Sequence, residues 1–162
     1  MGGRTLLATW AIASAMPLWA AASAGACDLP GRLEATRPVA AEMTAGFGLR
    51  KHPILQIDRM HLGVDFPAPI GAPVVAAAAG RVLSAGRSGE YGNLVVVEHG
   101  GGLATYYAHL ARIEVAEGAC LAAGAAIGRV GTTGLSAEPH LHFEVRRNGA
   151  PVDPAPLLDG AR

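Results

Sequence analysis

The chain has 162 residues, of which 51% are hydrophobic and 16% charged, and its formal net charge at pH 7 is +0. This length fits one globular domain of ordinary size and leaves no room for a second large one. The neutral balance excludes the strongly basic field that recruits nucleic acid or anionic membranes, so we expect no nucleic-acid partner. The 22 glycines and 11 prolines favour short strands joined by tight turns over a helical protein.

The N-terminus differs in composition from the rest of the chain. Residues 1–24 contain one positive charge, at Arg4, followed by an apolar run and by the small residues Ala22 and Ala24. This order of regions is typical of a cleaved signal peptide. The alternative, an uncleaved membrane anchor, is disfavoured because the apolar run is short for a bilayer span. We therefore expect an exported protein, periplasmic or secreted, with no membrane span after cleavage.

The expected export makes the number of cysteines informative, because exported proteins can form stable disulfides. Cys27 and Cys120 are the only two cysteines. In an oxidising compartment, an even number of cysteines indicates disulfide pairing. Neither has a CxxC partner, which disfavours a zinc–thiolate site. We predict an intrachain Cys27–Cys120 disulfide that ties the N-terminal segment to the body of the domain.

The body of the chain alternates β-rich runs with glycine turns. Residues 94–99 and 103–109 flank the glycine run 100–102 and predict a β-hairpin. "GAAIGRVGTTG" and "HLHFEVRRNG" predict two further strands bounded by glycines. Turn signals roughly every ten residues favour an all-β sandwich or barrel over βαβ units, and we expect little helix.

The strand predicted at "HLHFEVRRNG" places two histidines on one face. Alternate residues of a strand point to opposite faces. One face would then carry the apolar residues Leu141, Phe143 and Val145 towards a core. The other face would carry His140, His142 and Glu144. Two imidazoles on one face are either part of a solvated surface or half of a metal site.

A second group of candidate ligands lies in "HLGVDF". His61 precedes Asp65 by four residues, and Gly63 between them argues against a helix. In an extended chain, residues i and i+4 share a face, so both side chains can reach one ion. With His142 they form a set of two imidazoles and one carboxylate, which suits zinc and leaves a fourth position for water. HxxxD alone is a weak signal for which a chance surface pair is the better explanation, but the HxH pattern strengthens it.

The chain as a whole resembles the lysostaphin-type (LytM-like) zinc metallopeptidases, which cut peptide cross-links in bacterial peptidoglycan. The segments that match are "FGLRKHP", "HLGVDFPAPIGAPVVAAAAGRV", "YGNLVVVEHGGGLATYYAHL", "GAAIGRVGTTG" and "PHLHFEVRRNGAPVDPAPLL". They place the peptidase domain at 46–158. Together with the signal peptide at 1–24, this leaves a short N-terminal segment at 25–45 and a C-terminal tail at 159–162. The implied fold is all-β and lysostaphin-like, with a duplicated hybrid motif. It has a compact, mostly antiparallel sandwich or barrel-like core, with the active-site groove over the sheet.

The resemblance also implies roles for five residues. His61, Asp65 and His142 match the zinc ligands, with one Zn²⁺ per chain. His109 and His140 match the two catalytic histidines, which we expect to share proton transfer and oxyanion stabilisation.

The implied function is that of a zinc metalloendopeptidase whose partner is the peptide cross-link of peptidoglycan, and we expect a monomer. D-alanyl–diaminopimelate and glycyl-glycine links both remain open, and we favour D,D-endopeptidase action. The alternative is a non-catalytic LytM-like module that binds and activates other cell-wall hydrolases. Such modules lose ligands or catalytic histidines, whereas this chain keeps all five residues.

Several other residues have open roles. We expect His52 to line the groove or form a structural hydrogen bond, and His99 to pack beside the glycine turn. One of Tyr106 and Tyr107 is expected to pack in the core and the other to line the groove. Arg50 is expected either to meet a carboxylate of the substrate or to be solvated. Glu138 departs from the family pattern; it is expected to raise a histidine pKa, to influence substrate preference or to point to solvent.

Overall fold

The computed structural model describes residues 27–33 and 36–158. The expected signal peptide and C-terminal tail lie outside the described residues. The strands, in chain order, are β1 Gly48–Lys51, β2 Asp58–His61, β3 Val64–Pro67, β4 Pro73–Val75, β5 Gly80–Ser88, β6 Gly92–Gly100, β7 Leu103–Leu110, β8 Arg112–Ile113, β9 Cys120–Leu121, β10 Ala126–Arg129, β11 His140–Arg147 and β12 Ala150–Val152. The helices in the described part of the chain are short: the 3₁₀ turn η2 Gly89–Tyr91 and α1 Ala155–Leu158.

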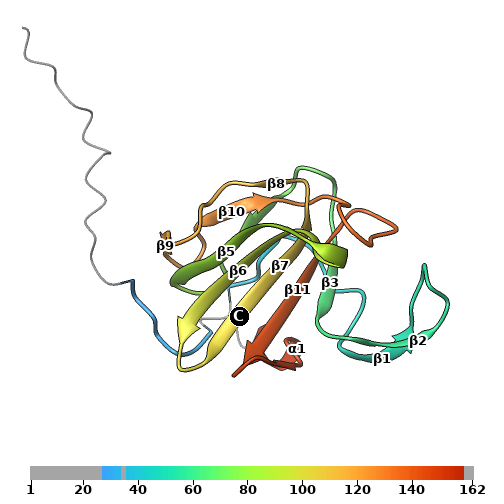
Figure 1. Ribbon diagram of the computed structural model, residues 1–162, viewed down its shortest axis with the longest axis horizontal. Helices are drawn as coiled ribbons and strands as arrows, with labels where there is room; N and C mark the ends of the chain where they lie inside the picture. The colour runs from blue at the N-terminus through green and yellow to red at the C-terminus, as the bar shows by residue number, and fades with distance from the viewer. Residues whose placement is uncertain (1–26, 34–35, 159–162) are drawn as a thin grey trace, which may run out of the picture.

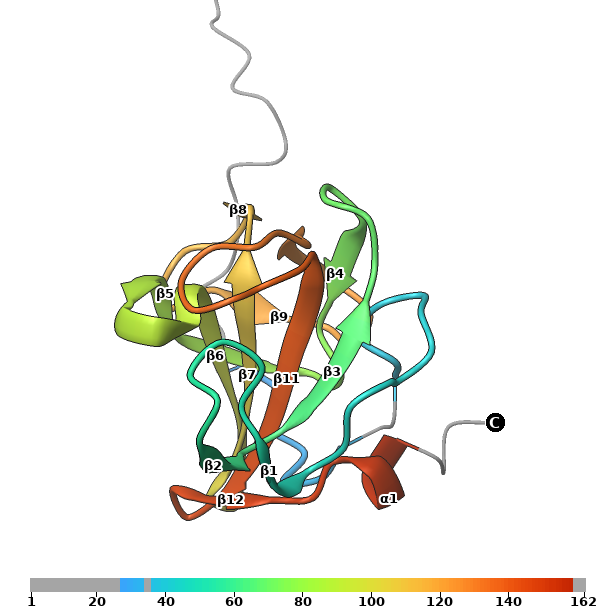
Figure 2. The ribbon, with the colours of Figure 1, turned by 90° about the vertical axis from the view of Figure 1, so that its right-hand side faces the viewer.

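The strands form three antiparallel sheets. The largest has the order β12-β11-β7-β6-β5-β9, with β3 also paired to β11. A second sheet has the order β4-β10-β8, and β1 and β2 form a separate hairpin that extends away from the body (Figure 1). Figure 2 shows β3 lying along β11, with the hairpin at one end of this pair. The expected all-β, antiparallel fold with little helix is confirmed.

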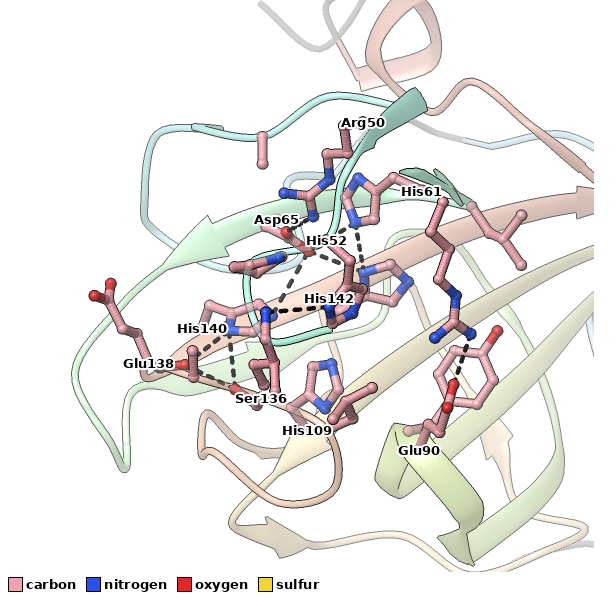
Figure 3. A pocket seen from close by; sticks show the side chains of 18 of the residues that line it. Arg50, His52, His61, Asp65, Glu90, His109, Ser136, Glu138, His140 and His142 are labelled. Carbon is pink, nitrogen blue, oxygen red and sulfur yellow. Dashed lines mark hydrogen bonds and ion pairs between the residues drawn. The ribbon is translucent and has the colours of Figure 1, made fainter. Parts of the chain in front are cut away.

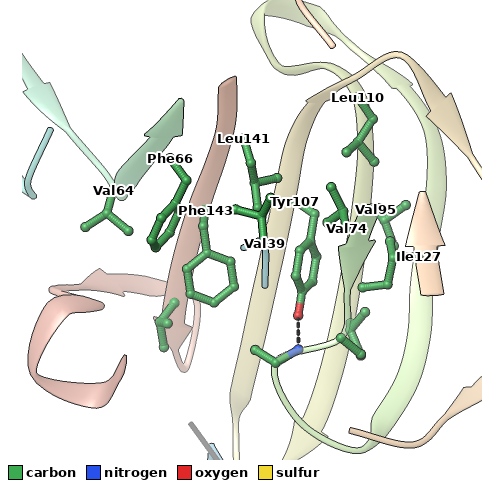
Figure 4. Packing of buried hydrophobic residues seen from close by; sticks show 14 of the residues in the cluster. Val39, Val64, Phe66, Val74, Val95, Tyr107, Leu110, Ile127, Leu141 and Phe143 are labelled. Carbon is green, nitrogen blue, oxygen red and sulfur yellow. Dashed lines mark hydrogen bonds between the residues drawn. The ribbon is translucent and has the colours of Figure 1, made fainter. Parts of the chain in front are cut away.

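The core lies between the large sheet and the three-stranded sheet (Figure 4). Tyr107 on β7 and Phe143 on β11 are fully buried, and their ring centroids are 5.3 Å apart. Val74 on β4 and Ile127 on β10 close the cluster from the other sheet. Each such side chain stabilises the fold by roughly 1.5–3 kcal/mol relative to an exposed position. The strand alternation that turns these residues inward turns His140 and His142 outward.

The two consecutive tyrosines of β7 point to opposite faces, as the sequence predicts. The Tyr107 hydroxyl accepts a hydrogen bond from the Ala77 backbone N–H over 2.9 Å, which satisfies both groups inside the core. Tyr106 lies on the outer face, where the Arg146 guanidinium sits 4.2 Å from its ring centroid. Tyr106 does not line the groove, so this part of the expectation is wrong: the residue packs beneath an arginine instead.

His99 is fully buried at the end of β6 beside the glycine turn, as expected. Its Nδ1–H donates to the Ala79 carbonyl over 2.7 Å, and its Nε2 pairs with the Thr105 hydroxyl over 2.8 Å. Burial lowers the pKa of His99. The imidazole is therefore a neutral hydrogen-bonded part of the core.

The N-terminal segment is attached to the body at several points. The predicted Cys27–Cys120 disulfide is present and spans a sequence separation of 93 residues. The Gly31 N–H donates to the His99 carbonyl over 2.6 Å, and Val39 is buried in the core. No helix within the described ranges is long and apolar enough to cross a membrane.

Candidate metal centre

A groove of about 390 Å³ opens between the β1–β2 hairpin and the ends of β7 and β11 (Figure 3). The loop before β11 and the turn η2 complete its walls. All five residues expected in the site line it: His61, Asp65, His109, His140 and His142. The structure thus brings together side chains that are up to 81 positions apart in the sequence.

The pairing of β3 with β11 positions two of these residues. Asp65 and His142 are direct partners in the antiparallel register, so their side chains share one face. On the opposite face, Leu141 and Phe143 are fully buried. The expected alternation along β11 is confirmed, with the imidazoles on the groove side.

His61 and Asp65 do not lie on one continuous strand, contrary to the expectation. His61 ends β2 and Asp65 belongs to β3, with a break at residues 62–63. Gly63 passes so close to β11 that a Cβ there would lie 2.2 Å from the Phe143 carbonyl oxygen. Only glycine fits this crossing, which turns the chain from the hairpin onto the sheet and aims both side chains at one point.

Three side-chain atoms converge at this point. Nε2 of His61 lies 3.1 Å from Oδ1 of Asp65 and 3.0 Å from Nδ1 of His142. The third side of the triangle, from His142 Nδ1 to Asp65 Oδ1, is 2.9 Å. Adjacent ligands of a tetrahedral zinc ion with bonds of about 2.0 Å are about 3.3 Å apart. The triangle is therefore close to the size of one tetrahedral face.

The outer partners of the two imidazoles fix which nitrogens face inward. We assign His61 Nδ1–H as donor to the Gly46 carbonyl over 2.7 Å, and His142 Nε2–H as donor to the Glu144 carboxylate over 3.1 Å. Both inner nitrogens then present lone pairs, and Asp65 adds a carboxylate oxygen. Three lone pairs within about 3 Å need a positive charge between them, so the residues fit a bound divalent metal.

Asp65 is held by its second oxygen. Oδ2 accepts a hydrogen bond from the Arg50 guanidinium over 2.8 Å, while Oδ1 faces the imidazoles. Without a metal, a proton on His142 or His61 takes the place of the ion: burial alone would raise the pKa of Asp65, but hydrogen bonds from these imidazoles hold that pKa well below its usual range. Asp65 is thus a carboxylate, as a metal ligand must be. Arg50 is thus bound to Asp65 rather than fully solvated, and a contact with a substrate carboxylate stays a prediction.

A buried hydrogen-bond network holds His142 on the side of its imidazole that faces away from Asp65. Glu144 is fully buried and accepts hydrogen bonds from the Tyr91 hydroxyl and from Arg146, each over 2.7 Å. Burial alone would raise the pKa of Glu144, but His142, Tyr91 and Arg146 lower it. No role for Glu144 was predicted from the sequence. Its position two residues after His142, on the same strand face, could have indicated that it contacts this histidine.

The other two histidines stand beside the triangle with a common arrangement. His109 Nδ1–H donates to the Thr133 carbonyl over 2.8 Å, and His140 Nδ1–H donates to the Glu138 carbonyl over 2.8 Å. Their ring centroids are 4.8 Å apart, and His140 Nε2 lies 3.6 Å from Asp65 Oδ1. Each imidazole therefore keeps Nε2 free to exchange a proton within the groove.

His109 has two features of a functional residue. It is the penultimate residue of β7 and has a φ of 60°, a left-handed conformation that costs energy for a residue other than glycine. Burial lowers its pKa to about 4, and the nearby His140 and His142 act in the same direction. At neutral pH His109 is therefore an uncharged proton acceptor.

Two further expectations concern the groove walls. His52 lines the groove, and its Nδ1 accepts hydrogen bonds from the backbone N–H groups of Ile54 and Leu55, so both roles expected for it are present. Glu138 contacts His140 through its main-chain carbonyl, while its exposed carboxylate points away from the histidines (Figure 3). Of the three outcomes expected for Glu138, the structure shows the solvent-facing one.

The fold and this group of residues define a β-rich domain with a groove in which three side chains could hold a metal ion. A family model described as "Peptidase family M23" matches residues 59–154. The chain belongs to this family.

Named relatives agree with this assignment. The chain is 49% identical over 112 residues to "DD-carboxypeptidase/endopeptidase Mpg" of Neisseria meningitidis, covering 69% of this chain and 26% of the relative. It is 41% identical over 113 residues to "Peptidoglycan DD-endopeptidase ShyB" of Vibrio cholerae, with the same two shares. The chain thus spans about a quarter of the length of these relatives.

Solved structures share the fold. A zinc-containing peptidase from Vibrio cholerae superimposes with a TM-score of 0.65 at 40% identity, over 70% of this chain and 35% of that chain. The catalytic domain of lysostaphin from Staphylococcus simulans gives a TM-score of 0.67 at 36% identity, over 74% of this chain and 92% of that domain. The lysostaphin-like fold expected from the sequence is confirmed.

Proposed function

We propose that this protein is a zinc-dependent endopeptidase that hydrolyses peptide cross-links of peptidoglycan as a D,D-endopeptidase. One observation supports this most: His61, Asp65 and His142 direct three lone pairs at one point, and two further imidazoles stand beside it. Two imidazoles and a carboxylate are a ligand set typical of catalytic zinc. The relatives named as DD-endopeptidases support the choice of bond.

In this proposal each residue has one task. His61, Asp65 and His142 hold the zinc, which supplies a Lewis acid and a lowered pKa for water when bound. His109, neutral and with Nε2 free, takes a proton from the attacking water. His140 stands 4.8 Å away, ring to ring, and donates a hydrogen bond to the developing oxyanion or a proton to the leaving amine. The walls of the groove keep an extended peptide beside these groups.

We also propose that the protein acts outside the cytoplasm as a monomer, after removal of residues 1–24. The Cys27–Cys120 disulfide supports this location, because such bonds form and persist in oxidising compartments. Peptidoglycan is assembled and cross-linked in the same location.

The test is digestion of purified peptidoglycan by the protein, followed by mass spectrometry of the released fragments. We expect monomeric muropeptides to be released from D-alanyl–diaminopimelate cross-links. Chelator should abolish the release and added zinc should restore it. The His142→Ala variant should be inactive under all conditions. The masses of the new termini identify the bond that is cut.

A different result would support the alternative. If the protein with zinc cleaves neither D-alanyl–diaminopimelate nor pentaglycine cross-links, the proposal is wrong. A gain in activity of other wall hydrolases upon addition of the protein would then identify it as a non-catalytic activator.

A further inference from the structure

An ion pair spans the groove beside the metal centre. Arg59, on β2, reaches the Glu90 carboxylate on η2 over 2.6 Å, joining two walls that are 31 residues apart in sequence. Figure 3 shows this pair as the dashed line at Glu90. Both side chains line the groove. Their contact therefore occupies space that an extended peptide needs.

Arg59 and Glu90 can exchange this ion pair for contacts with other charged groups at little cost to the stability of the fold. The side chains of Arg59 and Glu90 are 41% and 58% exposed, and ion pairs between such exposed groups contribute little to stability. The other arginine of the groove, Arg50, is 36% exposed, but its guanidinium binds Asp65, whose side chain is only 13% exposed and faces the imidazoles of the candidate centre. Among the described residues that line the groove, Arg59 is therefore the arginine that can change partner without disturbing this centre.

Arg59 also lies close to the position where the scissile peptide bond would bind. It precedes His61 by two residues on the same strand, so both side chains point to the groove face of the hairpin. Two residues of strand span about 6.6 Å. An anion on Arg59 would therefore lie within one or two residues of a peptide bond placed at the metal centre.

We propose that Arg59 is a specificity residue that binds a free carboxylate next to the scissile bond, in exchange for Glu90. This inference rests on the proposed peptidoglycan endopeptidase function and deepens it. In a D-alanyl–diaminopimelate cross-link, the carbon that bears the scissile nitrogen also bears a free carboxylate. A glycyl-glycine bridge has no such group. Arg59 thus favours the first type of cross-link over the second.

The charges of the other walls orient this carboxylate. Glu90 and Glu138 lie on the walls away from the hairpin and repel an anion. Arg59 offers a planar guanidinium, which pairs with carboxylates through two parallel hydrogen bonds. A substrate carboxylate on the hairpin side gains this contact and avoids both acids.

The experiment compares two cross-linked muropeptide dimers that differ in one group. One has the free carboxylate next to the scissile bond, and the other has this carboxylate amidated. Steady-state kinetics and calorimetric binding are measured for the parent protein and for Arg59→Gln, Arg59→Lys and Glu90→Gln. Arg81→Gln is the matched control, because Arg81 also forms an ion pair with a glutamate, Glu98, but does not line the groove.

We expect the parent protein to prefer the free carboxylate. Arg59→Gln should raise KM for this dimer about tenfold, as loss of a charge-assisted hydrogen bond implies, with kcat and the amidated dimer little affected. Arg59→Lys should restore part of the preference. Glu90→Gln should lower KM for the free carboxylate several-fold, and Arg81→Gln should change nothing.

Two outcomes would overturn the inference. Equal effects of Arg59→Gln on both dimers would show that the ion pair only shapes the groove. Equal affinity of the parent protein for both dimers would show that no carboxylate is recognised. If the protein cleaves neither dimer, the proposed function fails, and the calorimetric preference still decides the role of Arg59.

Discussion

Glu144 accepts a hydrogen bond from Nε2 of His142 over 3.1 Å, on the side of the imidazole that faces away from Asp65. This contact fixes the ring orientation and leaves Nδ1 unprotonated towards the metal centre. Carboxylates in this position also increase the basicity of a metal-binding imidazole. Because Glu144 is itself held by Tyr91 and Arg146, His142 is positioned before any metal binds.

We expect Glu144→Gln to weaken zinc binding by about 10- to 100-fold, as is typical when such an outer partner is lost. Competition with a chromogenic chelator measures the affinity directly, without relying on activity. Tyr91→Phe, which removes one hydrogen bond to the same carboxylate, should have a smaller effect. Exposed Glu117 provides the control variant Glu117→Gln. Unchanged zinc affinity in a folded Glu144→Gln protein would contradict this role.

Substitution of a proposed zinc ligand and substitution of a proposed catalytic histidine should have different effects on zinc content and activity. His61→Ala removes a proposed ligand and should lose both zinc and activity. His109→Ala should retain zinc, since its Nδ1 contacts the Thr133 carbonyl and its ring stands beside the triangle. We expect it to lower kcat by about 10²- to 10⁴-fold, the usual contribution of a general base. Metal analysis together with kinetics distinguishes the two variants, and loss of zinc in His109→Ala would argue against this division.

The buried His99 predicts a pH dependence of stability. Its pKa is lowered by burial in the folded protein, whereas the unfolded chain binds a proton at about pH 6.5. The unfolded state therefore takes up more protons as the pH falls below 6.5, and stability falls towards the lowered folded pKa. Above pH 6.5 the contribution is complete.

Urea unfolding at several pH values, with metal removed by chelator, measures this effect. The unfolding free energy of the parent protein should fall between pH 7 and pH 5 more steeply than that of His99→Gln. The difference cannot exceed about 1.4 kcal/mol per pH unit for one proton. Parallel curves for the two proteins would show that His99 does not titrate on unfolding.

The disulfide should stabilise the fold without taking part in the site. Cys27 and Cys120 close a loop with a sequence separation of 93, and cross-links of this kind typically contribute roughly 2–4 kcal/mol. The double variant Cys27→Ser/Cys120→Ser should unfold at lower urea concentration but bind zinc with unchanged affinity. Reduction of the parent protein should lower its unfolding midpoint to a similar value. A loss of zinc affinity would reveal a coupling that the structure does not suggest.

Local patterns predicted the parts of the site that local geometry determines. The period-two alternation of β11 placed His140 and His142 on one face and Phe143 in the core, because strand geometry leaves no other choice. The hairpin of β6 and β7 followed from the glycine turn between them. These features depend on neighbours in sequence.

The convergence of the site depends on contacts that no local pattern encodes. HxxxD indicated two side chains that do converge, but for a wrong reason, since His61 and Asp65 lie on two different strands. Their meeting with His142 was expected from the chemistry of the three side chains and from the family resemblance, because no local pattern predicts that β3 pairs with β11. The outer partners at Gly46, Thr133 and Glu138 are main-chain carbonyls, and any residue type provides a carbonyl.

The register between β3 and β11 has a consequence for how the protein reaches its native state. A shift of one residue would bring Leu141 or Phe143 opposite Asp65 and turn His142 into the interior. Such a misaligned chain retains most of its backbone hydrogen bonds but cannot bind the metal. A ligand that binds only the correct state raises the population of that state. If the proposed zinc is bound, its binding free energy would therefore also favour the correct alignment of β3 and β11 over misaligned states.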